Sequence, residues 1–368
     1  MPRNYVCERV EKAPVIDGVL DDTVWADVTW TQQFTDIEGH LKPAPRHKTT
    51  CAMAWDDQFF YIAARMTEPH VNAFLTERDA VIYHDNDFEV FIDPDGDNHL
   101  YYELEINALN TVWDLLLIKP YRDGAPAVNA WDIQGLRTAV HVDGTLNDPS
   151  DKDRGWSVEI AIPWKVLAEC AGRPSPPEAG HIWRVNFSRV QWRYHVVDGG
   201  YEKLIDPDTG KAFPENNWVW SPQGLIAMHY PERWGEVLFV GPDYNGNPER
   251  TINTNTEHAS INTARALMDV YYAQKQWQED HGGFAATKDE LEEEYGRLML
   301  KWSTRIATTD GDRYVLPYKW AFEMEATADR FTATLNTPAG VITVDEEGRL
   351  LRDPLQPPED CNCLHPKP

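Results

Sequence analysis

The sequence predicts a mainly β protein, in which a β-sandwich is followed by a small α+β domain. Two observations lead to this prediction. Residues 1–240 contain many short runs rich in β-branched and aromatic residues, with Gly, Pro and Asp clusters between them. After residue 256 the apolar residues change to helical spacing. Many short strands separated by turn signals are typical of a sandwich or a barrel.

The strands expected in the first region alternate apolar and polar residues or form short buried runs. Tyr101–Asn107 and Trp156–Ile162 alternate with period two. One segment, Trp164–Ala171, follows Pro163 and favours a helix. The other expected strands are Phe60–Met66, Phe88–Asp93, Thr138–Val142, Trp183–Trp192 and Val237–Val240.

The remaining sequence predicts a linker, an α+β module and a tail. Turn-forming residues over 241–256 indicate a linker. Within the module, 257–352, residues 258–280 have helical spacing, and Gly282–Gly283 ends that helix. The tail, 353–368, contains five prolines and is expected to be extended or disordered. The module's other expected elements are a helix at Lys288–Tyr295 behind the N-cap Thr287, and strands at Ala321–Glu325, Arg330–Leu335 and Gly340–Val344.

Composition excludes several classes of protein. The 368 residues include 60 Asp and Glu against 34 Lys and Arg, for a net charge of −26. Such an acidic surface repels phosphate backbones, so a nucleic acid is a poor partner. No run of 18 apolar residues predicts a membrane span. Met1–Tyr5 lacks the apolar stretch of a signal peptide, which leaves the cellular location open.

Carboxylates gather on both sides of the strand Phe88–Asp93. Dense carboxylates with Gly in a tight loop are the hard oxygen ligands that suit Ca²⁺. We therefore predict a structural calcium site, and the alternative is a solvated acidic turn. The candidate ligands are Asp85, Asp87, Asp93, Asp95 and Asp97.

A second group of polar residues lies on the strand Tyr101–Asn107. Period two places Glu103, Glu105 and Asn107 on one face, and Glu89 on the preceding strand is expected close by. Burying carboxylates without partners is costly, so this face is expected to meet solvent, a cleft or a metal. It can hydrogen-bond sugar hydroxyls, or two of its carboxylates can form a glycosidase acid/base pair. An ordinary exposed polar sheet face is the alternative.

Tryptophan is concentrated in the first region, where twelve of the fifteen residues lie before residue 251. The segment Asn216–Trp220 places Asn amides beside two Trp side chains. An indole face stacks on a sugar ring while an amide meets its hydroxyls. A core Trp pair is the alternative reading of the same residues.

Four segments together resemble the carbohydrate-binding module family 9-like domain over about residues 5–240. They are Ile16–Trp25, Asp85–Pro94, Tyr101–Asn107 and Gly155–Trp164. The resemblance implies a β-sandwich of that family's type with structural calcium. It also implies a terminal sugar held between two aromatic side chains, with polar residues beneath it. Relatives of this type are commonly exported to the periplasm or the cell exterior.

The resemblance also implies residue roles. Tyr83 is one aromatic wall, Glu89 is the carboxylate under the sugar, and Asn107 is a further polar contact. Asn217 and Trp220 are the opposing amide and wall. The expected function is binding of an oligo- or polysaccharide in carbohydrate catabolism.

Two other functions compete with this expectation. One is a glycoside hydrolase that uses two carboxylates, and the other is a purely structural or adhesion role. The candidate catalytic carboxylates are Glu89, Glu103, Glu105 and Asp114.

The C-terminal module resembles the globular part of a type IV pilin or pseudopilin. The resemblance rests on Ala264–Gln278, His281–Phe284 and Arg330–Thr334. A pilin's apolar N-terminal helix is missing from the sequence, so we expect a docking or packing module that contacts another protein.

Overall fold

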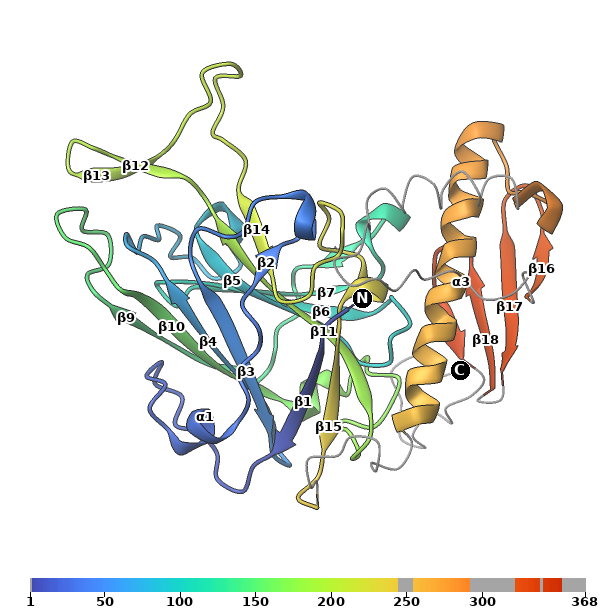
Figure 1. The fold of residues 1–368 in the computed structure, drawn as a ribbon, viewed down its shortest axis with the longest axis horizontal. Coiled ribbons are helices and arrows are strands. Elements are labelled where there is room, and N and C mark those ends of the chain that lie inside the picture. The colour runs from blue at the N-terminus through green and yellow to red at the C-terminus, as the bar shows by residue number, and fades with distance from the viewer. Residues whose placement is uncertain (1, 244–253, 292–321, 338–339, 353–368) are drawn as a thin grey trace.

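The computed structural model describes residues 2–243, 254–291, 322–337 and 340–352 (Figure 1). Residues up to Val240 form the large-sheet domain, which is built on one sheet of 13 strands. The strand order is β8 (Ala127–Val128), β7 (Val112–Leu117), β6 (Tyr101–Asn107), β5 (Asp87–Asp93), β11 (Ile182–Gln191), β15 (Gly235–Val240), β1 (Asn4–Arg9), β3 (Thr49–Trp55), β4 (Phe59–Thr67), β10 (Gly155–Pro163) and β9 (Arg137–Asp143). Beside this path, β14 (Asn216–Val219) pairs with β11 and with β2 (Thr35–Asp36).

The sheet curls so that its two halves share one core. Val90 and Phe187 from β5 and β11 belong to the same buried cluster as Ile62 and Val158 from β4 and β10. This arrangement confirms the predicted mainly β sandwich. Most of the tryptophan is core: Trp164 and Trp183, for example, meet edge to face with ring centroids 5.5 Å apart.

The expected strands are confirmed with small shifts at their ends, but one local expectation is wrong and one element was not predicted. The helix predicted over Trp164–Ala171 stops early, since α2 spans Trp164–Leu167. The region after β11 holds a separate hairpin, β12 (Tyr194–Val197) and β13 (Gly200–Lys203), that the sequence did not indicate. The other short helices are α1 (Thr23–Asp27), η1 (Gly39–Leu41), η2 (Ile82–His84), η3 (Tyr121–Asp123) and η4 (Pro231–Arg233).

A buried carboxylate ties the N-terminal motif to the sheet. Glu159 Oε2 accepts hydrogen bonds from the backbone N–H groups of Asp17 (3.0 Å) and Gly18 (2.8 Å), and Oε1 accepts one from Trp25 Nε1 (2.6 Å). Gly18 has φ +84°, and a Cβ there would lie 2.6 Å from the backbone nitrogen of His141. Only glycine fits this close approach. The Ile16–Trp25 motif therefore has a structural role.

The C-terminal module consists of a long helix against a small sheet. The helix α3 (Thr254–His281) packs on the antiparallel sheet β16 (Glu323–Ala326), β17 (Phe331–Thr337), β18 (Gly340–Asp345) and β19 (Leu350–Arg352). Leu267 and Tyr271 of α3 share a buried cluster with Phe331 and Val344. In Figure 1, α3 lies between the small sheet and the large one.

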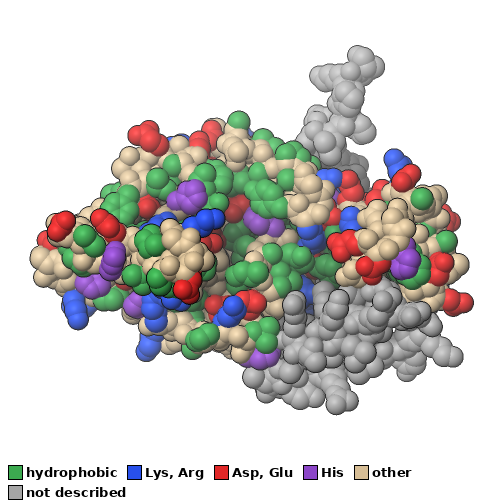
Figure 2. All heavy atoms as spheres, turned by 90° about the horizontal axis from the view of Figure 1, so that it is seen from above, with side chains coloured by type: hydrophobic (Ala, Val, Ile, Leu, Met, Phe, Trp, Pro, Cys, Tyr) green, Lys and Arg blue, Asp and Glu red, His purple; other side chains and the backbone are tan. Residues whose placement is uncertain are grey.

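Some predicted segments fall partly or wholly outside the described residues. Lys288–Leu291 is helical, and the rest of the helix predicted to Tyr295 lies outside them. The tail 353–368 and most of the linker 241–256 also lie outside them. The domain boundaries remain predictions. No helix in the described part of the chain is long and apolar enough to cross a membrane. Acidic side chains spread over both parts of the molecule (Figure 2).

A largely buried arginine lies where the two parts meet. Arg122 of η3 donates from both terminal nitrogens to the two Glu232 carboxylate oxygens, each at 3.1 Å. Tyr272 of α3 donates its hydroxyl to the same carboxylate. The next residue of η3, Asp123, accepts a 2.5 Å hydrogen bond from the Tyr271 hydroxyl. These contacts, which we call the η3 clamp, fix η3 against α3.

We expect Glu159→Gln to destabilise the protein. The variant has one acceptor oxygen in place of two and places an N–H₂ group against buried donors. Each donor left without a partner costs about 1–3 kcal/mol. The free energy of unfolding from urea titration measures the loss. Glu11→Gln, at an exposed carboxylate, is the control, and an equal effect in both variants would contradict the role of Glu159.

We also expect Arg122→Met to destabilise the protein strongly. The substitution leaves the Glu232 carboxylate buried and without its guanidinium partner, which costs about 3–5 kcal/mol. Urea unfolding followed by Trp fluorescence measures it. The matched control is Arg154→Met, since Arg154 and its partner Asp143 are both exposed. If the two variants unfold at the same urea concentration, the η3 clamp contributes nothing to stability.

Candidate functional site

Four side chains form a row across four neighbouring strands, on the sheet face that points away from the core. In the strand register Glu89 of β5 lies between Ser188 of β11 and Glu105 of β6, and Glu105 lies next to Trp113 of β7. Side chains paired in this way have Cβ atoms about 4.5–5.5 Å apart. We call these four residues the acidic row.

Two further carboxylates flank the acidic row and share its burial. Oxygen atoms of Asp87, Glu89 and Glu105 lie within 4.8 Å of one another. Glu103 lies one pair further along β6, and all four carboxyl groups are buried. The Asp87 carboxylate accepts from Val190 N (3.2 Å), and Glu105 accepts from Tyr83 N (2.8 Å). Within the described ranges, no Lys or Arg side chain forms an ion pair with these four groups.

Burial and mutual repulsion raise the pKa values of these four carboxyl groups. Burial raises the pKa of Glu89 to about 7, and the charge of Glu215 adds to the rise. Burial also raises the pKa values of Asp87, Glu103 and Glu105 well above their usual range, and the charge of Glu89 adds to each. Like charges in directly opposed strand pairs are destabilising. A cluster retained at this cost is typical of a functional site.

Two exposed tyrosines border the acidic row. Tyr83 of η2 is 37% exposed and Tyr121 of η3 is 50% exposed. The ring centroid of Tyr83 lies 6.4 Å from that of Trp113, and Tyr121 packs edge to face on His229 at 4.5 Å. Burial is the main cause that raises the pKa of both Tyr121 and Tyr83. The charges of Glu103 and Glu105 raise both pKa values further. Both phenols are therefore close enough for the charges of Glu103 and Glu105 to act on them.

The structure brings together some of the predicted sugar contacts. Tyr83 and Glu89 meet at the acidic row. Asn217 is half-buried on β14, and nearby Glu215 is close enough for its charge to act on Glu89 and Tyr83. The sugar-binding roles of Tyr83, Glu89 and Asn217 stay predictions.

Two other predicted contacts are wrong. Trp220 is only 1% exposed and packs against Tyr5 and Phe187, so its ring cannot stack on a sugar opposite Tyr83. The core alternative holds for this residue. Asn107 is fully buried and its amide is used within the protein. Its Nδ2 donates to Leu75 O and Asp85 Oδ2, and its Oδ1 accepts from Leu109 N and Thr111 N.

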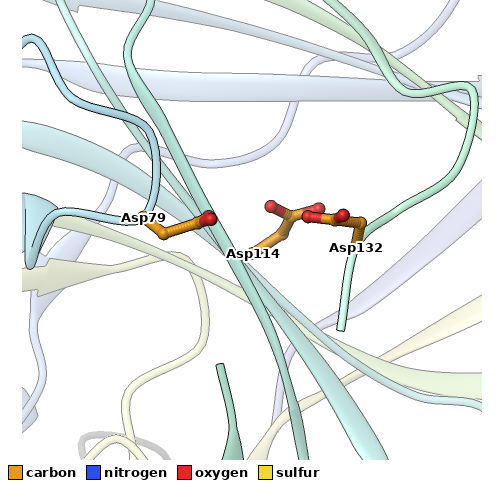
Figure 3. Close-up of side chains that lie close together, drawn as sticks. All are labelled: Asp79, Asp114 and Asp132. Atoms are coloured by element: carbon orange, nitrogen blue, oxygen red, sulfur yellow. The ribbon is translucent and has the colours of Figure 1, made fainter. Parts of the chain in front are cut away.

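Asp114 is also wrong as a partner of Glu103 and Glu105. It pairs with Leu104 in the strand register, so alternation turns it toward the opposite face. There it accepts from Arg78 and from Ile133 N, and lies close to Asp79 and Asp132 (Figure 3). The strand register therefore excludes a hydrolase pair of Asp114 with Glu89, Glu103 or Glu105.

The five predicted calcium ligands do not form one site, because β5 separates them. Asp85 and Asp87 lie before or at the start of the strand, and the other three lie at its end or just beyond it. Asp85 Oδ2 accepts from the backbone N–H groups of Phe74 (2.7 Å) and Leu75 (2.8 Å), so it caps a loop.

Asp93, Asp95 and Asp97 gather within 4.8 Å of one another, but arginines surround them. Arg349 Nε donates to Asp97 Oδ2 at 3.0 Å, and Arg184 Nη1 lies 3.9 Å from Asp93 Oδ2. Leu350 N also donates to Asp97 O at 3.0 Å. Arg349 and Leu350 thus dock the C-terminal module at this turn, and a calcium ion here, which would have to compete with the guanidinium groups, stays a prediction.

Residues 16–179 match the sequence model of the family described as "Carbohydrate family 9 binding domain-like". The match contains Glu89, Glu105 and Trp113 of the acidic row and both tyrosines, and it ends before Ser188. It does not reach the C-terminal module, whose resemblance to pilins stays a prediction.

Three proteins are similar to parts of the chain. Exoglucanase XynX of Acetivibrio thermocellus is 28% identical over 162 residues, 44% of this chain and 12% of that protein. Endo-1,4-beta-xylanase A of Thermoanaerobacterium saccharolyticum is 28% identical over 159 residues, 43% of this chain and 12% of that protein. The matches thus span about an eighth of these relatives. A family 9 module from Caldicellulosiruptor kristjanssonii, in complex with cellotriose, is 16% identical with a TM-score of 0.40, over 67% of this chain and 97% of that one.

The sequence analysis missed Ser188, Trp113 and Tyr121. Trp113 follows Glu105 across a short hairpin, so extending the strand pairing by one strand places it on the same face. Ser188 lies in a long buried strand, where all ten residues are buried and no alternation marks the face. No pattern in the sequence around Tyr121 places it near the acidic row, because contacts with the distant helix α3 fix its segment.

We expect the acidic row to make stability fall as pH rises. A carboxyl group with a raised pKa binds more protons in the folded state, so its stabilising effect is complete below about pH 4.5 and is lost toward about pH 7 for Glu89. Glu89→Gln cannot ionise and should gain up to about 3 kcal/mol relative to wild type between pH 5 and pH 8.

Urea unfolding at both pH values, with chelator present, measures this difference. Asp21→Asn, at an exposed position, is the control and should show the same offset at both pH values. A constant offset for Glu89→Gln would show that Glu89 does not titrate with a raised pKa.

Proposed function

We propose that this protein binds carbohydrate, with a sugar ring between Tyr83 and Tyr121 and its hydroxyls over the acidic row. One observation carries the proposal: two exposed phenol rings border a buried set of hydrogen-bond acceptors. The apolar face of a sugar ring packs on an aromatic side chain, and its hydroxyls donate to carboxylates beneath. The family match over residues 16–179 supports the same function.

The first ligands to test come from the relatives. Their names describe an exoglucanase, a 1,4-beta-xylanase and a module in complex with cellotriose. Those activities belong to proteins of which this chain spans only a small part. We propose that short β-1,4-linked glucans or xylans are bound here, without cleavage, in support of carbohydrate catabolism.

A hydrolase needs two carboxyl groups in different protonation states, one ionised and one protonated. Burial raises the pKa values of Glu89, Glu103 and Glu105 in the same direction, and no described base holds any of them ionised. With Asp114 on the other face, the carboxylates favour binding over hydrolysis.

Calorimetric titration with cellotriose and xylotriose tests the proposal. Tyr83→Ala and Tyr121→Ala should each weaken binding at least about tenfold, which corresponds to about 1.4 kcal/mol of lost stacking. Tyr201→Ala, at a tyrosine of the β12–β13 hairpin, is the control and should bind as wild type does. If neither sugar binds, and a wider glycan panel is also negative, the proposed function fails. Unchanged binding in both wall variants would reject the two-tyrosine site.

A further inference from the structure

A cavity of about 530 Å³ lies between the start of β1 and the segment Thr29–Gln32. It forms because β1 pairs with β3 at its end, at Glu8 and Arg9, and diverges from it before that point. There the segment is the neighbour of β3, since Thr31 N donates to Cys51 O at 2.8 Å. The volume lies within the range of small-ligand sites, about 300–1,000 Å³. In the sheet order β11 and β15 separate β1 from β5, so the cavity is distinct from the acidic row.

Hydrogen bonds fix the walls of the cavity. The Tyr5 hydroxyl donates to Thr29 O at 2.6 Å, which ties β1 to the segment. Arg3 is held by its backbone, because its N–H donates to Ser221 Oγ (3.0 Å) and its carbonyl accepts from Glu236 N (2.9 Å). A site whose walls are ordered before binding loses little conformational entropy when a ligand enters.

Arg3 supplies a positive charge to this cavity. Its Nη1 donates to Gln33 O at 2.8 Å, which holds the half-buried guanidinium group against the segment. No Asp or Glu in the described ranges forms an ion pair with it or contributes to the shift of its pKa, which burial lowers. Glu8 also lines the cavity, and it is not among the charges that act on Arg3. A guanidinium group has five N–H donors, so this one has donors left for a ligand, and their planar fork matches a carboxylate.

The rest of the lining suits a sugar ring. Trp30 is half-buried and fixed, since its Nε1 donates to Trp25 O at 2.8 Å and the Arg65 guanidinium lies over its ring, 3.5 Å from the centroid. Asn4 and Gln32 add exposed amides, which can donate to hydroxyl groups and accept from them. An aromatic side chain packs on the apolar face of a sugar ring while amides meet its hydroxyls.

We propose that this cavity binds a uronic acid, that is, a sugar ring that carries a carboxylate. Arg3 pairs with the carboxylate, and Trp30 packs on the ring with the face opposite Arg65. The amides of Asn4 and Gln32 bind the hydroxyls. Arg3 lies outside residues 16–179, so its charge is not part of the family match, and the site does not depend on the proposed function.

The charge of the ligand also follows from the protein as a whole. The net charge of −26 opposes the approach of anions, and it opposes a dianionic phosphate more than a singly charged carboxylate. At physiological ionic strength, charges farther away than about 8 Å are largely screened, whereas direct contact with Arg3 is not.

The direct test titrates methyl β-glucuronide into full-length protein and follows binding by saturation-transfer NMR. A ligand of this size should bind with a Kd of about 1 mM. Arg3→Gln should weaken binding at least tenfold, because it removes the charge that pairs with the carboxylate. Arg154→Gln, at an exposed arginine, is the matched control and should bind as wild type does. Gln32→Ala, at an exposed neutral residue, should weaken binding about threefold, which keeps the inference testable if Arg3→Gln fails to fold.

Three results would overturn the inference. The first is the absence of glucuronide binding to the wild-type protein. The second is wild-type affinity in both Arg3→Gln and Gln32→Ala. The third is displacement of the glucuronide by an equal concentration of acetate, which would show that the sugar ring is not recognised.

A second comparison separates this cavity from the acidic row. Tyr83→Ala should leave glucuronide binding unchanged, and Arg3→Gln should leave cellotriose binding unchanged. If cellotriose binds and the glucuronide does not, the proposed function stands and the uronic acid site is rejected. If the glucuronide binds and no neutral sugar does, the proposed function fails while the cavity's role stands. If Tyr83→Ala rather than Arg3→Gln abolishes glucuronide binding, the ligand occupies the acidic row and the inference is wrong.

Discussion

The free energy of placing carboxylates inside a β-sheet protein is the constraint on which this structure depends. Each buried acid needs a partner, and the fold provides different ones. Glu232 has the Arg122 guanidinium, and Glu159 has two backbone amides and an indole. Asp114 has Arg78. Where the partner is a built-in donor, the acid fastens the fold together. At Glu89 no described Lys or Arg forms an ion pair with the acid, and the proposed function assigns it to a ligand.

The same principle explains the role of the C-terminal module. Its helix α3 packs beside η3, and the η3 clamp stabilises the segment that carries Tyr121. The small sheet adds Arg349, which approaches the acidic turn after β5. The module thus supports both ends of the region that contains the acidic row. Under the proposed function its contribution is positional, because its described contacts hold the segment that carries Tyr121 and the turn after β5.

How much the sequence could predict depended on the range of the determining contacts. Alternation along Tyr101–Asn107 is local, so the shared face of Glu103 and Glu105 was predicted correctly. The direction of Trp220 was not, because it depends on packing against Phe187 in another strand. Tyr121 could not be found at all, since the hydrogen bond that holds its segment joins residues 148 positions apart. Which buried acids are neutralised likewise depends on which arginine reaches which carboxylate in the folded protein. The alternation of residues along a strand does not predict those pairs.

The η3 clamp also affects whether the region that matches the family can be moved into another protein. In the large relatives the matching region is about an eighth of the chain. Here, residues 16–179 contain both tyrosines but neither Ser188 nor the Glu232 and Tyr271 side chains that hold η3. Transplanting the matched region into another protein would move Tyr121 without the contacts that hold its segment. The smallest part of this chain that could be moved with Tyr121 held in place is therefore the large sheet together with helix α3.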